Sequence, residues 1–296
     1  MNKYIRPQKI NSDMGGDGNQ LDERLSQVFD LLNLLSFDGY KTVLDIGTGK
    51  AQIAKWFTKK GFKVKGTGLS VDSYEINLKE ENEYENIEII ECNIEQMPFQ
   101  NGSFDIIIMS HVLEHCYNIG LALQEVRRIL SPNGILCIFV PPHDDFVCAG
   151  HISMGWNLGQ LMYVLLVNGF DTKEGKFAQY GYNVSGVVKI NNCELPPIRG
   201  DRGDIHIIDN YGLWPIPIFS SDGLNDNFFG RVRSINWDIQ KLIDKENNNK
   251  SIYQKIILAS LKILPVKFKY LLSVKLYSLS RMIALSFKNN FLRSPN

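Results

Sequence analysis

The segment Val43-Leu44-Asp45-Ile46-Gly47-Thr48-Gly49-Lys50 carries the strongest structural signal in this 296-residue chain. An apolar run enters a turn that has glycine at two alternate positions. Glycine has no Cβ, so it permits positive φ and lets a ligand approach the backbone closely. The pattern predicts a buried β-strand that breaks into a glycine turn and opens a helix, a geometry that cradles a small cofactor.

The acid in this segment separates it from a dinucleotide-binding turn. A dinucleotide loop has the pattern G-x-G-x-x-G after its strand, but Gln52 occupies the position of the third glycine. Asp45 instead precedes two glycines as acid-x-Gly-x-Gly. This order resembles the first motif of the class I S-adenosylmethionine (SAM) methyltransferases, whose ligand carries an α-amino group that an acid can orient. A purely structural turn is the alternative.

Further stretches follow in the order and at the spacing of the same family. They begin with two strand-like segments and an M-P-F…G-S-F-D approach to a third apolar run. The sequence H-V-L-E-H follows, and then a periodic helix turns through S-P-N-G into another strand. These stretches are residues 63–70, 86–91, 97–109, 111–115 and 121–140. They resemble the "methyltransferase type 11" branch over roughly half of the chain, which favours the cofactor turn.

Alternation of strands and helices over the first 190 residues predicts an α/β fold with a mostly parallel sheet. The resemblance implies a Rossmann-like sheet of seven strands, with residues 172–180 and 182–190 as an antiparallel pair at its edge. We expect four parts, namely a flexible arm or lid over 1–20, a SAM-binding methyltransferase domain over 21–192, a loop-rich substrate-covering insertion over 193–236 and a basic helical region over 237–296.

The predicted cofactor site lies outside the carboxyl ends of the parallel strands, where several loops converge. The resemblance places Asp45, Gly47 and Gly49 at the methionine moiety of SAM. The family usually has a ribose-binding acid at the end of the second strand, but this chain has Gly68 there, followed by Leu69. Asp72 is the candidate substitute, although an acid at the start of a helix also favours the helix dipole without a ligand.

Two further turns complete the predicted cofactor site. Asn93 and Ile94 follow the third strand at the position that contacts the adenine edge, where the Asn93 amide oxygen can accept from an exocyclic amine. Ser110 and His111 follow the fourth strand, close to the sulfonium. The implied cofactor is SAM, with S-adenosylhomocysteine as its product.

Four of the five histidines fall in the loops after the fourth and fifth strands, where the methyl acceptor must lie. Transfer to a hydroxyl needs a base, and the pKa of histidine lies near working pH. We expect His115 and His151 ahead of His143 as base, with Glu114 beside them. Each histidine has a purely structural alternative role.

The spacing of the candidate ligands does not favour a metal site. The order His111-x-x-Glu114-His115 differs from the zinc motif H-E-x-x-H. Asp144 and Asp145 offer carboxylates for Mg²⁺, but adjacent acids in a loop are usually solvated. The sequence therefore predicts no metal site.

Charge is unevenly distributed along the chain. Nine of the 32 Lys and Arg residues and none of the 32 Asp and Glu residues lie in 250–296, so the remainder carries a net charge of −9. Apolar segments over 252–264 and 266–287 with interleaved lysines are typical of basic amphipathic helices. Such helices dock on an anionic membrane surface, on a partner or on a second copy of the chain, or they pack on the protein's own surface.

Three features of the sequence bear on the compartment of the protein. The five cysteines form no C-x-x-C pair, the N-terminus has no apolar signal core, and no apolar run is long enough to cross a bilayer. We expect a cytoplasmic enzyme, peripheral at the inner membrane face if the tail binds there. Nucleic acid is an unexpected partner, because the acidic catalytic part repels phosphate and Val140-Pro141-Pro142-His143 lacks the aromatic residue of the amino-methylating motif.

Three functions remain open. The first is O-methylation of a nucleotide-linked or lipid-linked sugar in surface polysaccharide synthesis. It is favoured by the histidines, by the tail, by the resemblance of the 150–156 loop to proteins of that process, and by aromatic residues able to stack on sugar rings, namely Trp214, Phe219, Phe228 and Trp237. The second is methylation of a quinone-like or other small acceptor, whose enzymes share the V-L-E-H sequence. The third is a SAM-binding protein without catalysis.

Overall fold

The computed structural model describes residues 23–69, 87–143, 150–153, 155–198, 200, 203–220, 223–224 and 228–248. The arm over 1–20, Asp72, the Asp144–Asp145 pair and the basic tail from 250 lie outside these ranges. The chain divides into one unit ending at Gln240 and another beginning at Lys241. Predictions about the arm and the tail stay predictions.

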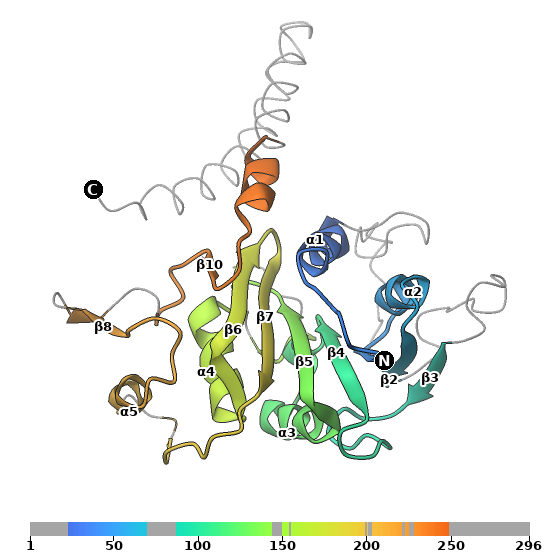
Figure 1. Ribbon diagram of the computed structural model, residues 1–296, viewed down its shortest axis with the longest axis horizontal. Coiled ribbons are helices and arrows are strands. Elements are labelled where there is room, and N and C mark those ends of the chain that lie inside the picture. The colour runs from blue at the N-terminus through green and yellow to red at the C-terminus, as the bar shows by residue number, and fades with distance from the viewer. Residues whose placement is uncertain are drawn as a thin grey trace, which may run out of the picture. The chain divides into compact units, whose positions relative to one another are not determined.

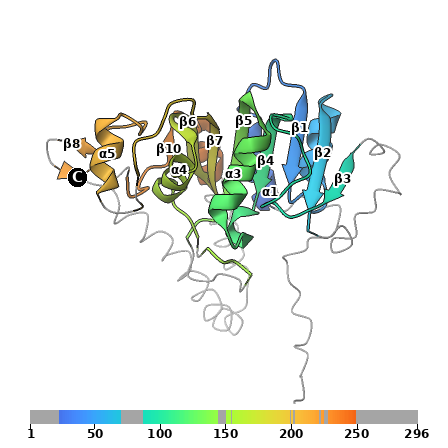
Figure 2. The same cartoon turned by 90° about the horizontal axis from the view of Figure 1, so that it is seen from below.

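The centre of the first unit is an eight-stranded sheet in the order β10-β6-β7-β5-β4-β1-β2-β3, which Figure 2 shows in succession. The strands are β1 (Thr42–Ile46), β2 (Lys63–Gly68), β3 (Glu88–Glu91), β4 (Phe104–Ser110), β5 (Leu130–Val140), β6 (Phe170–Tyr180), β7 (Asn183–Ile190) and β10 (Ser234–Ile235). Strands β1 to β5 pair in parallel, whereas β7 pairs antiparallel with β5 and β6. The predicted mostly parallel α/β sheet is confirmed, with β10 as an eighth strand on β6.

Helices cover both faces of this sheet. Figure 1 shows α1 (Glu23–Leu32) and α2 (Gln52–Lys59) on one face, and α3 (Ile119–Ile129) and α4 (Leu158–Val167) on the other. The remaining elements are a 3₁₀ turn (Leu113–His115), α5 (Asp204–Asn210) and a short hairpin of β8 (Phe219–Ser220) and β9 (Gly223–Leu224). A parallel sheet whose two faces are both covered needs strands that are apolar throughout. Strand β1 fits this rule, because four of its five residues are buried.

Helix α4 begins at Leu158, and Asn157 caps its first turn: the Asn157 side chain accepts from the Gln160 N–H, and the Gln160 side chain accepts from the Asn157 N–H. Trp156 stays outside the helix and donates its backbone N–H to the Pro141 carbonyl. This hydrogen bond places Trp156 beside the end of β5.

The expected turn over 131–134 lies inside the observed range of β5. Leu130 pairs with Phe104, and the next pair is Ile135 with Ile106, so residues 131–134 are left out of register with β4. Ser131-Pro132-Asn133-Gly134 therefore forms an irregularity within the strand. Among the helices of the described ranges, none is long and apolar enough to cross a membrane.

Candidate active site

The turn after β1 has positive φ at every second residue, with 69° at Gly47, 51° at Gly49 and 58° at Ala51. Ala51, the N-cap of α2, carries a side chain in a region that L residues rarely adopt. Backbone strain of this kind gathers at ligand sites, where the surrounding structure enforces it. The two glycines were predicted for this turn, whereas Ala51 has no sequence signal.

Tight packing explains two of the glycines around this turn. A Cβ at Gly47 would overlap Cγ2 of Val112, which follows β4. A Cβ at Gly66 in β2 would overlap Oγ1 of Thr48, whose hydroxyl donates to the Asp45 carbonyl. By contrast, a Cβ at Gly49 would meet only the Gly47 carbonyl oxygen, at 3.8 Å. The turn thus rests against β2 and the β4 loop and leaves the Gly49 side open.

Asp45 is almost fully buried at the end of β1. Its Oδ2 accepts the backbone N–H of Ala54 at 3.2 Å, which connects the strand to the first turn of α2. Burial raises the pKa of Asp45 to about 7, and the Ala54 hydrogen bond opposes this rise. The carboxylate therefore has a structural role in the turn, and its predicted contact with the SAM amino group stays a prediction.

The other predicted cofactor residues lie along the same edge of the sheet. Gly68 ends β2 and its carbonyl accepts the N–H of Cys92, which joins the ends of β2 and β3. Leu69 follows with 76% of its surface exposed, an uncovered apolar side chain beside the expected ribose position. Asn93 is exposed, and its Oδ1 accepts the Glu95 N–H.

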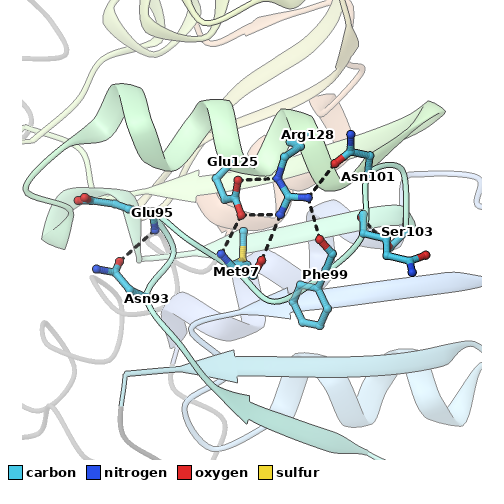
Figure 3. Close-up of polar contacts among 9 residues, drawn as sticks. Asn93, Glu95, Met97, Phe99, Asn101, Ser103, Glu125 and Arg128 are labelled. Carbon is cyan, nitrogen blue, oxygen red and sulfur yellow. Dashed lines mark hydrogen bonds and ion pairs between the residues drawn. The ribbon is translucent and has the colours of Figure 1, made fainter.

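An arginine holds the loop that carries Asn93 and Ile94. Arg128 of α3 donates to Glu125 and to the carbonyls of Phe99 and Met97, and Glu125 accepts the Met97 N–H, as Figure 3 shows. These bonds tie the 97–101 stretch to α3, because a guanidinium presents several donors in a fixed plane. Neither Glu125 nor Arg128 was predicted as a site residue.

Ser110 ends β4, and His111 follows it with a strained φ of 57°. The His111 ring is 8% exposed and stacks on Tyr182. Its Nε2 lies 3.0 Å from Oδ1 of Asn183, whose Nδ2 donates to the Arg24 carbonyl. The Asn183 amide is thereby oriented, so Nε2 of His111 carries the proton and Nδ1 faces Oε1 of Glu114 at 3.2 Å.

Three of the predicted catalytic residues meet in one cluster. The His115 and His151 rings lie edge to face with centroids 4.8 Å apart, and one ligand-type atom from each of these and from Glu114 lies within 4.8 Å of the others. The Glu114 side chain is completely buried. Burial lowers the pKa of His151, and the nearby Glu114 charge opposes this shift. Neutral imidazole is the form that accepts a proton.

His143 lies apart from this cluster, on the wall of a cavity of about 800 Å³. Helix α4 and the loops before it form one side, including Ser153, Trp156 and Tyr163. The predicted insertion contributes Gly200, Ile205, Leu224, Phe228 and Phe229. Trp214 and Trp237, two of the aromatic residues expected to stack on sugars, are instead buried at 4% and 5% exposure, so they are not available for stacking.

Comparison with known proteins shows what part of this chain is similar to a known family. Residues 44–138 match the model of a methyltransferase domain family. A demethylmenaquinone methyltransferase of Chlorobaculum tepidum is 32% identical over 33% of this chain and 40% of its own length. A ubiquinone/menaquinone biosynthesis C-methyltransferase of Rickettsia typhi is 29% identical over 32% of this chain and 43% of its own length. The chain thus spans about two fifths of these relatives.

Among solved structures, a 1,6-didemethyltoxoflavin-N1-methyltransferase of Burkholderia thailandensis, bound to S-adenosylhomocysteine, is similar with a TM-score of 0.50 and 16% identity, covering 57% of this chain and 80% of that one. The PH0226 protein of Pyrococcus horikoshii is similar with a TM-score of 0.50 and 18% identity, covering 59% of this chain and 94% of that one. At such identities the likeness concerns the fold. Residues 44–138, about a third of the chain, are thus similar to a methyltransferase domain family, and the fold is similar to that of a methyltransferase bound to S-adenosylhomocysteine.

Proposed function

We propose that the protein transfers a methyl group from SAM to a small, quinone-like acceptor. The observation that carries the proposal is the apolar cavity that is lined by His143 after β5, by α4 and by the insertion; in the sheet order, β4 lies between β5 and β1 with its glycine turn. The names of the two curated relatives, which refer to menaquinone and ubiquinone synthesis, favour this acceptor class over a sugar.

The donor side of the proposal rests on the β1 turn. Gly49 leaves open space where the methionine moiety would lie, and a ligand ammonium near Asp45 would stabilise the charged form of a carboxyl group whose pKa burial raises to about 7. Leu69 would cover the adenosine.

The acceptor side rests on the composition of the cavity wall. Trp156, Tyr163 and Phe228 offer flat apolar surface that suits a ring system. Ser153 Oγ and Trp156 Nε1 belong to lining residues, are buried, and have no hydrogen-bond partner among the described residues. Buried polar atoms without partners are rare. Ring oxygens of a quinol or quinone would accept from both.

Methyl transfer to such a ring forms a carbon–carbon or carbon–oxygen bond while the sulfur–carbon bond of SAM breaks, and the acceptor loses a proton. His151 and His115 lie after the ends of β5 and β4, and a neutral His151 is suited to take that proton. The buried Glu114 would then stabilise the resulting imidazolium.

The experiment is a methyl-transfer assay with labelled SAM and two acceptor sets, reduced naphthoquinone precursors and nucleotide sugars. We expect labelled product from the first set, with a mass gain of one methylene unit. Product from nucleotide sugars alone would replace the quinone acceptor by the sugar. SAM binding with no product from either set would support the non-catalytic alternative.

SAM binding is measured separately by calorimetry. Asp45→Ala should weaken it by about 1.5–3 kcal/mol, the size of a lost hydrogen bond to a charged group. Unchanged affinity would assign Asp45 to the structure of the turn alone.

A further inference from the structure

We propose that Glu114, His115 and His151 form a binding site for a divalent transition-metal ion of the Zn²⁺ type. Their ligand-type atoms all lie within 4.8 Å of one another, and no residue spacing in the sequence indicated this set. Metal binding itself is independent of the acceptor that is proposed above.

The first argument is the state of the Glu114 carboxylate. The side chain is completely buried, and neither oxygen has a hydrogen-bond partner among the residues that the structure describes. His111 Nδ1 lies 3.2 Å from Oε1, and the two form an ion pair only when the imidazole is protonated. A buried carboxylate needs a cation or donated hydrogen bonds, because removing its charge from water is costly, and a neutral His111 supplies no cation.

The second argument is the tautomer of His115. Its Nδ1 lies 2.9 Å from the Gly150 carbonyl oxygen, which can only accept, so Nδ1 carries the proton. Nε2 therefore presents its lone pair. Metal-binding histidines commonly donate their other N–H to a backbone carbonyl in this way, which fixes the ring orientation.

The third argument is the way the fold brings His151 to the other two residues. The backbone N–H groups of Ile152 and Ser153 both donate to the Glu114 carbonyl, at 2.7 Å and 3.2 Å. These bonds hold the loop that precedes α4 against the 3₁₀ turn after β4. A His₂Glu set is one of the three-ligand arrangements of catalytic zinc sites, in which the fourth position stays open for water or substrate.

If the proposed function holds, an ion at this position would act on the methyl acceptor. Ser153 follows His151 by two residues and lines the acceptor cavity. With an ion bound, His151 would be a ligand and would no longer act as the base; the ion would instead bind an acceptor oxygen and lower its pKa, as metal ions do for water.

The test uses the full-length protein, freed of metal by a chelator and then dialysed, without SAM or acceptor. Zn²⁺ is titrated against a competing indicator, and Co²⁺ is titrated with its visible absorption as a report of imidazole coordination. We expect one equivalent to bind. Glu114→Gln and His151→Ala should each weaken binding by roughly tenfold or more, and Zn²⁺ should raise the melting temperature of the wild type but of neither variant.

His206→Ala is the matched control, since His206 stacks on Phe219 and is not one of the three clustered residues. It should bind Zn²⁺ as the wild type does. Absence of binding to the wild type, or equal binding to all four proteins, would overturn the proposal. Circular dichroism establishes that each variant is folded, and because SAM affinity is measured separately, failure of this site leaves the methyltransferase proposal to its own assay.

Discussion

A β-carbon placed on Gly47 in the turn after β1 would overlap Cγ2 of Val112 in the loop after β4. This contact joins the loops at the ends of two neighbouring strands. We expect Gly47→Ala to destabilise the protein by two effects, about 1–2 kcal/mol from the left-handed φ and about 1–3 kcal/mol from the overlap. SAM affinity should fall with it. Urea denaturation and calorimetry measure both.

Gly39→Ala is the control for this prediction. Gly39 has a φ of 87°, and a Cβ there would meet nothing within 4 Å, so only the backbone strain applies. Val112→Ala combined with Gly47→Ala should recover part of the loss by removing the overlapping methyl group. Equal losses at positions 39 and 47 would contradict the overlap.

The stability of the ligand-free protein should depend on pH through Asp45. Burial raises the folded pKa of Asp45 from 3.8 to about 7, so between these values the folded state holds a proton that the unfolded state has released. This contribution to stability is present at low pH and is lost as pH rises toward about 7. Asparagine does not titrate. The Asp45→Asn variant should therefore become more stable relative to the wild type as pH rises over that range, by up to about 4 kcal/mol.

The measurement is the difference in unfolding free energy between wild type and Asp45→Asn at about pH 5 and about pH 8. Taking a difference cancels the other titrating groups. A SAM ammonium at Asp45 would favour the charged form, so wild-type SAM affinity should also rise with pH over the same range. A pH-independent difference would show that Asp45 is ionised throughout.

Arg128 should determine the order of the loop after β3. Arg128→Ala removes hydrogen bonds to the carbonyls of Met97 and Phe99 and leaves Glu125, whose side chain is 13% exposed, without this cation. We expect a loss of about 1.5–3 kcal/mol in stability and faster hydrogen exchange of the amides over 93–101. SAM should bind more weakly, because this loop is expected to contact the adenine.

The neighbouring Arg127 provides the control for the same charge loss on α3. It is exposed, and Arg127→Ala should leave hydrogen exchange in the 93–101 loop unchanged. Faster exchange in both variants would assign the effect to the helix instead of to the Arg128 contacts.

The sheet was predictable because its parallel strands are continuous apolar runs between turn residues. Strand β10 was missed, since a strand of two residues gives no periodic signal. The cofactor turn was predictable from Asp45 and its glycines, because those residues act locally. The meeting of His151 with Glu114 depends on backbone hydrogen bonds between distant loops. No single-sequence pattern records such bonds. The positive φ of Ala51 had no signal either, because alanine rarely adopts that conformation.

The acceptor cavity leads to the last prediction. Trp156 and Trp237 are both buried indoles whose Nε1 has no hydrogen-bond partner in the described part of the chain, but only Trp156 lines the cavity. Phenylalanine keeps most of the apolar ring and removes the donor. If a ring oxygen of the acceptor binds Trp156, then Trp156→Phe should raise KM for that acceptor by about tenfold, the cost of one hydrogen bond, with the affinity for SAM unchanged. Trp237→Phe should leave KM as it is. Steady-state kinetics on the two variants separate these outcomes, and an equal KM for both would mean that the indole N–H of Trp156 does not contact the acceptor.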